Sequence, residues 1–339
     1  MNLIESEALF GRMLDGGMDD AEIAATLVSL ADKGETAEEI AGAALAMRAR
    51  MIPVIAPANA IDVCGTGGDG QHSLNVSTAV AIVVAACGVP VAKHGNRAAS
   101  SKAGGADTLE ALGLDLGAAS DMAETTLADL GIAFLFAQKH HPALSRIAPI
   151  RKALGRRTIF NLLGPLANPA GTKRQLVGVP TNSVLETYAH AMRMLDFEAF
   201  MVVCGSLTKS ITAREIDEIS ISGFTTIAEF PSREDQSHRP IGWEIGVSYT
   251  GTNPEYGGLP YHHYKALRGG DAEFNAAALR RLLMGEAGAY RDAVLLNAAG
   301  ALIVAGETRD WRDGVEEAAE AIDKGLATAL LDCWIAAVK

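Results

Sequence analysis

Apolar residues recur at helical spacing along the N-terminal part of the chain, from about residue 5 to residue 51. The repeating positions are Leu9, Phe10, Met13, Leu14, Ile23, Leu27 and Leu30. Thr36 and the acidic residues after it are typical of a helix start, because a threonine oxygen caps free N–H groups. Pro53 closes the pattern, and a short linker over residues 55–60 follows. The start of the chain is therefore predicted to be all helical.

From Ile61 onwards, short apolar runs of strand type alternate with helical stretches. The strand candidates are Ile61–Val63, Val89–Ala92, Ile132–Phe136, Arg174–Val179 and Ala199–Val203, with the apolar run Thr78–Cys87 between the first two. Such alternation predicts a mostly parallel central sheet flanked by helices. The predicted fold class is α/β, with a small all-α domain plus a large α/β domain.

The remaining segments divide between the two predicted domains. Residues 142–164 are helical by pattern and are expected to leave the sheet and pack against the N-terminal helices. Residues 237–264, rich in Gly, Pro and Tyr, predict an irregular or antiparallel excursion, and helices resume from Ala272. We expect a helical domain over residues 1–58, joined by helices from about 141–168. Residues 59–140 and 169–339 would form the large domain.

Composition agrees with an enzyme of this fold class and excludes several other functions. A chain of 339 residues, 49% of them hydrophobic, can bury a core without disulfides or a structural metal. A net charge of −12 opposes loose binding to nucleic acid. No apolar run approaches the roughly 18 residues of a membrane span, and the N-terminus lacks the basic start of a secretory signal. We expect a cytoplasmic enzyme that binds neither nucleic acid nor a membrane.

The cysteines give no sign of a bridge or a metal site. Cys64, Cys87, Cys204 and Cys333 stand far apart and form no Cys-x-x-Cys pair. They are expected to be reduced, buried small hydrophobes, as in cytosolic proteins.

A glycine-dense turn, residues 62–70 (DVCGTGGDG), directly follows the first predicted strand. Glycines remove side chains where backbone N–H groups approach an anion closely. Residues 75–78 (NVST) then open an apolar helix, whose free N–H groups suit a phosphate. The turn is neither a Walker loop nor a dinucleotide fingerprint. We interpret these segments as a phosphate cradle, the alternative being a plain Gly-rich connection and a helix cap.

A second polar loop, residues 93–107 (KHGNRAASSKAGGAD), follows another predicted strand. Its cations, hydroxyls and amide would surround a polyanion at the carboxyl ends of the strands. A solvated loop is the alternative interpretation. His94 alone would more often be structural than catalytic.

Two further groups carry possible chemistry. Asp217 and Glu218 are adjacent carboxylates, which suit magnesium when phosphate and water complete its octahedron. Surface charge is the alternative for this pair. His140, His141 and Arg151 form the last group, with a helix start and a solvated helix face as the respective alternatives.

Taken together, these stretches resemble the anthranilate phosphoribosyltransferases along nearly the whole chain and in the same order. The matching segments are GET at 34–36, GTGGD at 65–69, NVST at 75–78, KHGNR at 93–97, FLFA at 134–137, HPA at 141–143, RTIFNLLGPL at 157–166 and LLNAA at 295–299. The resemblance implies the architecture shared with pyrimidine nucleoside phosphorylases and a homodimer formed through the helical domain. It also implies transfer of ribose 5-phosphate from phosphoribosyl diphosphate to the amine of anthranilate, in tryptophan biosynthesis.

The resemblance also implies the site residues. The diphosphate ester would contact Gly65, Gly68, Asp69, Ser73, Asn75, Val76, Ser77, Thr78, Lys93, His94, Gly95, Asn96, Arg97, Ala98, Ala99, Ser100, Ser101 and Gly105. Anthranilate would contact Gly65, Asn96 and Arg151, the arginine pairing with its carboxylate. Two magnesium ions would be held by Ser77, Asp217 and Glu218, with Glu218 bridging. We assign no general base, because an aromatic amine is already neutral at pH 7 and leaving-group stabilisation is the main task.

The chain departs from the family pattern at several positions. Cys204 stands where histidine is usual, and the segment 206–214 lengthens the connection to Asp217, which leaves the metal geometry open. Gly105 replaces a usual serine and Gly300 a usual alanine, so altered affinity is expected. The alternatives are a nucleoside phosphorylase of the same architecture, a non-catalytic relative that binds nucleic acid, and a transferase acting on a related aminobenzoate.

Overall fold

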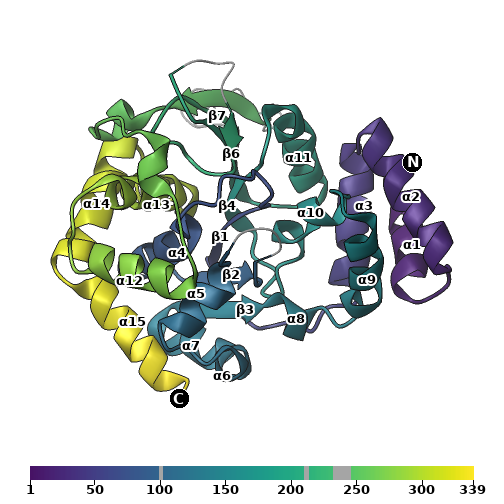
Figure 1. The fold of residues 1–339 in the computed structure, drawn as a ribbon, viewed down its shortest axis with the longest axis horizontal. Coiled ribbons are helices and arrows are strands. Elements are labelled where there is room, and N and C mark those ends of the chain that lie inside the picture. Colours follow the sequence, from purple (N-terminus) through teal and green to yellow (C-terminus); the bar gives the residue numbers. More distant parts are fainter. Residues whose placement is uncertain (99–101, 210–213, 232–245) are drawn as a thin grey trace, which may run out of the picture.

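The computed structural model describes residues 1–98, 102–209, 214–231 and 246–339 (Figure 1). The chain begins with three helices, α1 (Leu3–Leu14), α2 (Asp20–Lys33) and α3 (Ala37–Arg48). Each starts with a capping box, in which the N-cap side chain accepts a hydrogen bond from the N3 N–H and a glutamate at N3 bonds back. The N-caps are Asn2, Asp19 and Thr36. The predicted all-helical start, called the helical lobe below, is confirmed.

The central sheet is mostly parallel, as predicted. Its strands are β1 (Ile61–Gly65), β2 (Val91–Gly95), β3 (Ile132–Phe136), β4 (Arg174–Gly178), β5 (Ala199–Ser206), β6 (Glu215–Ile216), β7 (Thr225–Phe230) and β8 (Ser248–Thr252). They lie in the order β3-β2-β1-β4-β5-β7-β8, with β6 paired to β5. The first five strands in this order, β3, β2, β1, β4 and β5, are parallel to one another. The strands β6, β7 and β8 pair antiparallel with their neighbours. A small helical part and a large, mostly parallel α/β part are thus confirmed.

The strand predictions were least accurate where polar residues enter the sheet. β2 begins at Val91 and runs on through Lys93 and His94, both buried. β7 was not predicted, and of the excursion expected over residues 237–264, residues 237–245 lie outside the described part. The rest of that excursion contains β8 and the short helices η3 (Pro254–Gly257) and η4 (Tyr264–Leu267). The antiparallel half of the prediction is therefore confirmed for β8.

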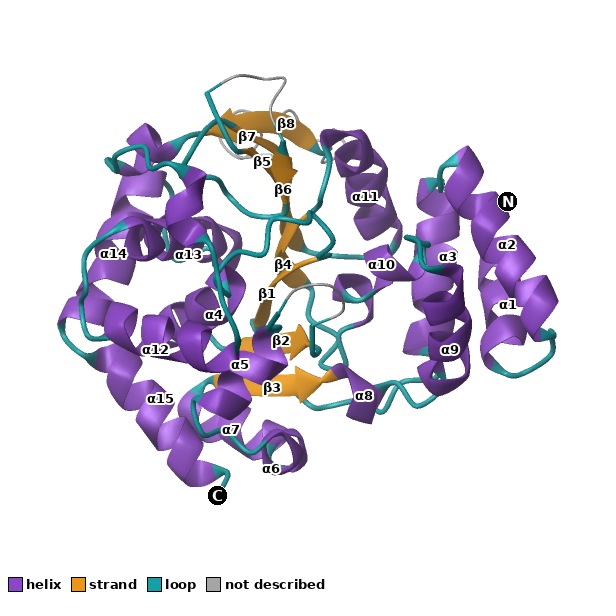
Figure 2. Cartoon of the chain, viewed as in Figure 1, coloured by secondary structure: helices purple, strands orange, loops and turns teal. Residues whose placement is uncertain are grey.

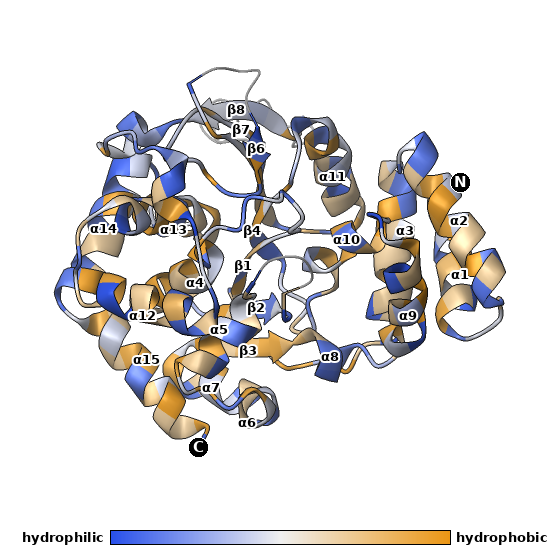
Figure 3. Cartoon of the chain, in the orientation of Figure 1, coloured by the Kyte–Doolittle hydropathy of each residue, from blue (hydrophilic) through white to orange (hydrophobic). Residues whose placement is uncertain are grey.

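Helices cover both faces of the sheet (Figure 2). One face packs against α4 (Val76–Ala86) and the C-terminal helices α12 (Ala272–Leu283), α13 (Ala289–Ala305), α14 (Trp311–Asp323) and α15 (Leu326–Ala337). Smaller helices at the β3 edge are α5 (Gly105–Ala111), α6 (Leu116–Asp121), α7 (Ala123–Leu130) and α8 (Ala137–His140). Figure 3 shows the strand β3 as hydrophobic, in keeping with its fully buried residues Ile132–Leu135.

The other face joins the sheet to the helical lobe. The helical stretch predicted over 142–164 contains α9 (Leu144–Leu154) and α10 (Phe160–Leu163), followed by η1 (Pro165–Ala167), and α11 (Asn182–Met194) lies beside them. One continuous core holds Phe10 of α1, Phe160 of α10 and Phe200 of β5. The rings of Phe10 and Phe160 meet edge to face, with centroids 5.9 Å apart. The residue limits of the two domains stay a prediction.

The order of the strands locates the place where a ligand binds in such sheets. From β1 the chain moves outward to β2 and β3, then returns to the opposite side of β1 as β4 and β5. The direction therefore reverses between β1 and β4. In open parallel sheets, ligands bind outside the carboxyl ends of the strands at this switch. Gly65 and Gly178 are the last residues of β1 and β4.

Two expectations about burial and membranes were tested by the fold. Within the described ranges, no helix is both long and apolar enough to cross a bilayer. All four cysteines are free, but only Cys204 is fully buried and Cys333 is exposed. The expectation of burial is thus wrong for Cys333, which lies on the outer side of α15.

Candidate active site

The glycine turn adopts the conformation that its composition predicts. Gly67, Gly68 and Gly70 have positive φ angles of 73°, 81° and 73°, which residues with a side chain rarely adopt. The turn connects β1 to the segment before α4, at the switch in strand order. The glycines of this turn therefore keep Cβ atoms away from the sheet edge.

Asp217 is inserted between the ends of β1 and β4. A Cβ atom at Gly65 would overlap the Asp217 carboxylate, and one at Gly178 would overlap the Asp217 backbone. The Gly67 N–H donates a hydrogen bond to Asp217 Oδ2 at 2.6 Å. The glycines at both strand ends thus make room for the acidic segment.

Burial and neighbouring carboxylates raise the pKa of both Asp217 and Glu218. Burial, followed by the charge of Asp69, raises the pKa of Asp217. Burial and the charges of Asp217 and Asp69 raise the pKa of Glu218 well above its usual range. Crowded, buried carboxylates of this kind favour a nearby cation.

The donor set next to these carboxylates fits magnesium. A cavity of about 20 Å³, lined in part by Ser77, Asp217, Glu218 and Asn297, is about large enough for one water molecule. Hydroxyl and carboxylate oxygens are ligands that magnesium takes, with phosphate and water completing the shell. Protein groups alone do not form a closed site, because the described residues contain no cluster of three or more His, Cys, Asp or Glu that could hold a metal.

Lys93 carries a buried positive charge toward the same edge. Its side chain, on β2, is 5% exposed, and Nζ donates hydrogen bonds to the Val63 carbonyl at 2.7 Å and to Ser77 Oγ at 3.1 Å. Burial lowers the pKa of Lys93, while the nearby Asp62 opposes this shift. Lys93 therefore links strand β1 to the start of α4.

The start of α4 is fixed by its N-cap residue, Asn75, in an unusual way. Asn75 Oδ1 accepts hydrogen bonds from Thr108 Oγ1 at 2.5 Å and from Asn275 Nδ2 at 2.9 Å. The Tyr290 hydroxyl donates to the Asn75 carbonyl at 3.3 Å. Asn75 consequently makes no side-chain cap for the helix. Its side chain holds α4 in place while leaving the helix start for an anion.

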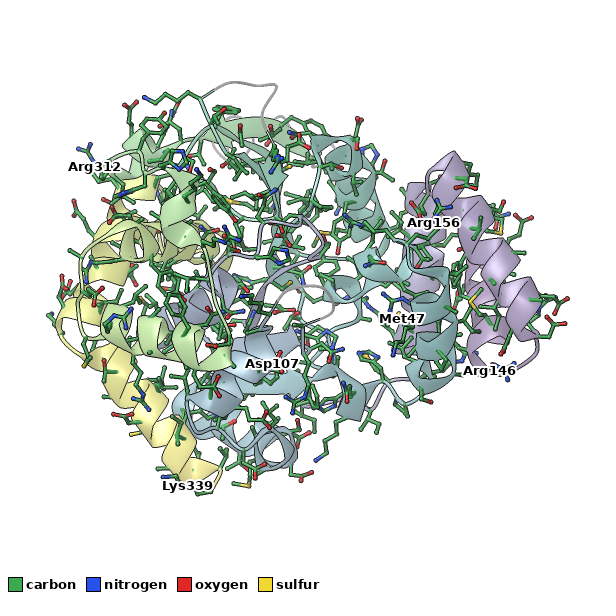
Figure 4. All side chains as sticks on the ribbon, viewed as in Figure 1. Met47, Asp107, Arg146, Arg156, Arg312 and Lys339 are labelled. Atoms are coloured by element: carbon green, nitrogen blue, oxygen red, sulfur yellow. The ribbon has the colours of Figure 1, made fainter. Side chains whose placement is uncertain are left out.

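The second polar loop is only partly arranged as predicted. The Arg97 guanidinium pairs with Asp107 at 2.9 Å and Glu110 at 2.8 Å, and these carboxylates raise its pKa. The Ala98 N–H also donates to Asp107 at 2.9 Å. Asp107, on α5 near the centre of Figure 4, thereby organises the loop. Ala99, Ser100 and Ser101 lie outside the described residues.

Two histidines face each other on the helical-lobe side of this loop. His94 and His141 have ring centroids 5.1 Å apart, and His94 Nδ1 donates to the Gly164 carbonyl at 2.9 Å. Burial lowers the pKa of His94 to about 3 and that of His141 to about 4. Nε2 of each is buried without a hydrogen-bond partner among the described residues. Both rings are thus neutral at pH 7, each with an unused polar atom.

Arg151, on α9, is a half-buried cation without a carboxylate. Its guanidinium lies 5.6 Å from the centre of the Phe160 ring, and burial lowers its pKa. Within the described ranges no acidic side chain forms an ion pair with it. Asn96, the other candidate for the acceptor, is exposed, and its Oδ1 accepts from the Arg97 N–H at 2.8 Å.

Sequence reasoning missed a buried polar network directly below the site. The Asp62 carboxylate, fully buried on β1, accepts hydrogen bonds from Asn168 Nδ2 at 2.8 Å, Gln175 Nε2 at 3.3 Å and the His94 N–H at 3.3 Å. Two polar residues could have indicated this network, because Asp62 and Gln175 each lie within a strand that was predicted to be buried. Arg157, part of a matched motif, was also not assigned, although Nη1 donates to the Gly68 carbonyl at 3.4 Å.

Comparisons with known proteins agree with this geometry. Residues 4–51 match the helical bundle domain, and residues 57–328 the a/b domain, of the glycosyl transferase family. The chain is 61% identical over 335 residues to the anthranilate phosphoribosyltransferase of Novosphingobium aromaticivorans, covering 99% of this chain and 96% of that one. It is 59% identical over 332 residues to that of Sphingopyxis alaskensis, covering 98% and 94%.

Solved structures show the same similarity. The crystal structure of anthranilate phosphoribosyltransferase from Thermus thermophilus matches with a TM-score of 0.89 and 39% identity, covering 100% of this chain and 96% of that one. The Saccharomyces cerevisiae enzyme in complex with phosphoribosyl diphosphate and magnesium matches with a TM-score of 0.82 and 28% identity, covering 94% and 85%. This chain belongs to the anthranilate phosphoribosyltransferase family.

Proposed function

We propose that this protein transfers the 5-phosphoribosyl group from phosphoribosyl diphosphate to the amine of anthranilate and releases diphosphate, a step of tryptophan biosynthesis. The observation that carries the proposal is the meeting of three features at the switch in strand order. These are the glycine turn, the uncapped start of α4 and the buried Asp217-Glu218 pair. The high identity to relatives with this named activity supports it.

Magnesium would be held by Ser77, Asp217 and Glu218, with two ions per subunit and Glu218 between them. The support is the donor chemistry and the raised pKa values of the two carboxyls, which a divalent cation would lower. The yeast relative was solved with phosphoribosyl diphosphate and magnesium bound. When bound, the ions would neutralise charge on the departing diphosphate.

The diphosphate ester would lie along the carboxyl edge of β1 and β2. Its binding residues would be Gly65, Gly68, Asp69, Ser73, the start of α4 over residues 75–78, the loop over residues 93–101, and Gly105. The positive-φ glycines, the uncapped helix start and the Lys93 charge support this placement. In the geometry described, Arg97 is engaged by Asp107 and Glu110, so we propose that its role is to hold the loop, with its backbone nearest the ligand.

Anthranilate would bind between this edge and the helical lobe. Arg151 would pair with the substrate carboxylate, and Asn96 and Gly65 would contact the ring and amine. A half-buried guanidinium without a carboxylate partner supports the pairing, because such a cation gains most from an anionic ligand. The neutral rings of His94 and His141 add no competing positive charge.

The reaction would proceed by substitution at the first carbon of ribose. The bond from this carbon to the diphosphate oxygen breaks, and its electron pair leaves with diphosphate. The amine nitrogen supplies the pair for the new carbon–nitrogen bond and then loses one proton. Since the aromatic amine is neutral at pH 7, positioning and charge stabilisation carry the catalysis, and no side chain is assigned as general base.

The test is the initial rate of anthranilate fluorescence loss, measured over a range of anthranilate concentrations with phosphoribosyl diphosphate and magnesium. Arg151→Ala is expected to lower kcat/KM for anthranilate by about 10- to 100-fold, because a charged hydrogen-bonded pair is lost. Arg156→Ala is the matched control: Arg156 pairs with Asp32 beside the helical lobe and is expected to leave the rate unchanged (Figure 4). Equal rates in the two variants would contradict the assigned role of Arg151.

The protein would act in the cytoplasm as a homodimer formed through the helical lobe. Exposed apolar side chains next to that lobe, Ile4 at 76% and Ile52 at 51% exposure, support such an interface. Sedimentation equilibrium at micromolar concentration is expected to give twice the chain mass of 35.4 kDa, and a single-chain mass would contradict the dimer.

A further inference from the structure

The segment from His262 to Gly270 crosses the candidate site and is hydrogen-bonded to both of its halves. The His262 N–H donates to the Ile221 carbonyl at 2.9 Å, just after the acidic pair. At its other end, the Leu74 N–H donates to the Leu267 carbonyl at 2.8 Å, and the Gly269 N–H to the His72 carbonyl at 2.9 Å. The backbone of this segment is therefore fixed between the carboxylates and the segment that precedes α4.

Tyr264, in η4, points from this segment into the interior. Its side chain belongs to the core, and the residue is only 9% exposed. The hydroxyl is buried, and no acceptor for its proton lies within hydrogen-bond distance in the part of the chain that the structure describes. Ser73 lies beside it as a donor and lowers its pKa, whereas the charges of Glu218 and Asp69 raise it. The hydroxyl is thus close to residues proposed for both the diphosphate ester and the metal.

The protonation state of Tyr264 makes it a hydrogen-bond donor. Burial, and then the charges of Glu218 and Asp69, raise the pKa of Tyr264 above its ordinary value. The hydroxyl consequently keeps its proton at neutral pH. A buried donor without a partner is unfavourable, because it has lost its hydrogen bonds to water and gained none. A ligand oxygen placed there would satisfy it.

A second tyrosine provides the contrast. Tyr290, on α13, also experiences the charge of Glu218, but its hydroxyl donates to the Asn75 carbonyl at 3.3 Å. That bond holds the start of α4. The two hydroxyls therefore differ in their hydrogen bonding. The Tyr290 hydroxyl donates to the protein backbone, whereas the Tyr264 hydroxyl has no acceptor among the described residues.

We propose that the Tyr264 hydroxyl donates a hydrogen bond to a diphosphate oxygen of bound phosphoribosyl diphosphate. This inference rests on the proposed function and adds a binding residue to it. Tyr264 lies outside all the motifs that mark the family in this sequence.

The test compares Tyr264→Phe with the wild type by calorimetric titration of phosphoribosyl diphosphate in the presence of magnesium. Loss of a hydrogen bond to a charged oxygen is expected to weaken binding about tenfold or more. The KM for anthranilate is expected to stay the same. Ligand-free Tyr264→Phe is expected to melt at the same or a higher temperature than the wild type, because the variant no longer buries an unpaired hydroxyl. Tyr256→Phe, at a residue 58% exposed on η3, is the matched control and is expected to change neither quantity.

Weaker binding without a loss of ligand-free stability supports the proposal. Unchanged binding in Tyr264→Phe overturns it, whether or not the melting temperature changes, and a lower melting temperature with unchanged binding would assign the hydroxyl a structural role. Failure of the wild type to bind phosphoribosyl diphosphate would overturn the proposed function together with this inference. The ligand-induced rise in melting temperature, smaller in Tyr264→Phe than in the wild type, gives a second readout in the same samples.

Discussion

Two buried carboxylate regions of this protein, one within the strands and one at their carboxyl ends, have opposite surroundings. Asp62, within β1, accepts hydrogen bonds from Asn168, Gln175 and the His94 backbone, and its main charged neighbour is the cation Lys93. Asp217 and Glu218, beyond the strand ends, have carboxylates as their main charged neighbours. The first region is neutralised by the protein itself. In the second, ionisation of the carboxyls is unfavourable until a cation binds beside them.

The neutral polar groups around the candidate site differ in whether the protein itself satisfies them. The side-chain oxygen of Asn75 is fully used by Thr108 and Asn275. By contrast, Nε2 of His94, Nε2 of His141 and the Tyr264 hydroxyl are buried without partners among the described residues. Buried atoms without partners also occur away from this edge among the described residues, for example Gln175 Oε1 and Trp334 Nε1. The three at the candidate site differ in lying beside residues proposed to bind the substrates, where a ligand would complete their hydrogen bonding.

The largest effect is expected when the charge at the strand ends is removed. Glu218→Gln keeps the shape of the side chain but is expected to lower kcat/KM on the order of 100-fold or more, through weaker stabilisation of the leaving group. The same change is expected to maintain or raise the melting temperature of the ligand-free protein, since an amide replaces a buried carboxyl whose ionisation is unfavourable. Steady-state rates and calorimetry check both. Retained activity with a lower melting temperature would place Glu218 in the scaffold.

The opposite outcome is expected at Asp62. Asp62→Ala leaves the buried Lys93 without its main counter-charge. It also removes one acceptor from the amides of Asn168 and Gln175, which keep their bonds to the carbonyls of Ala92 and Pro165. The free energy of unfolding is expected to fall by about 3–5 kcal/mol. Urea titration measures it, with Asp32→Ala, an exposed carboxylate paired to Arg156, as the control expected to stay within about 1 kcal/mol. A loss at Asp62 no larger than at Asp32 would remove the distinction between the two regions.

The unpaired histidines make stability depend on pH. Their folded pKa values, about 3 for His94 and about 4 for His141, lie below the ordinary value of 6.5. The unfolded chain therefore binds more protons, and stability is lost as pH falls below about 6.5, by about 1.4 kcal/mol per pH unit for each ring. Urea titrations at pH 7 and pH 5 measure this loss. His94→Asn, whose amide can still donate to Gly164, is expected to reduce it, and an equal loss in the variant would show that His94 is not the group responsible.

The smallest effect is expected at Gly105, where the family resemblance predicts a serine. A Cβ there would lie 3.0 Å from Thr78 Oγ1, so the neighbour has to shift slightly. Gly105→Ser adds one hydroxyl at the diphosphate edge and is expected to lower the KM for phosphoribosyl diphosphate by a few-fold, on the order of one neutral hydrogen bond. Gly105→Ala is the control, because it adds the Cβ atom of serine without the hydroxyl. A KM that changes equally in both would show that only the steric contact matters.

The sequence predicted most accurately what depends on local pattern. Helical periodicity and capping residues defined the helical lobe, and the strand Ile132–Phe136 was predicted with its correct ends. The glycine turn was predictable because positive φ angles require glycine. Pattern failed for β2, where Lys93 and His94 interrupt an apolar run but are buried, since both side chains find hydrogen-bond partners in the interior.

Hydrogen bonds between residues far apart in the chain could not be predicted from the sequence. Nothing local connects Asp62 with Asn168 or Asn75 with Asn275, because these partners are 106 and 200 residues apart. The left-over hydroxyl of Tyr264 is likewise visible only when every neighbouring donor and acceptor is placed. Residues that recognise ligands through unfilled hydrogen bonds therefore need the structure, whereas glycine turns and helix caps do not.

The most direct test of the account measures anthranilate and diphosphate in the same reaction mixture, with the purified protein, phosphoribosyl diphosphate and magnesium. The account predicts that anthranilate fluorescence disappears and diphosphate accumulates in equal molar amounts, and that EDTA stops both. Diphosphate released while anthranilate stays unchanged, or equal rates with and without EDTA, would contradict it.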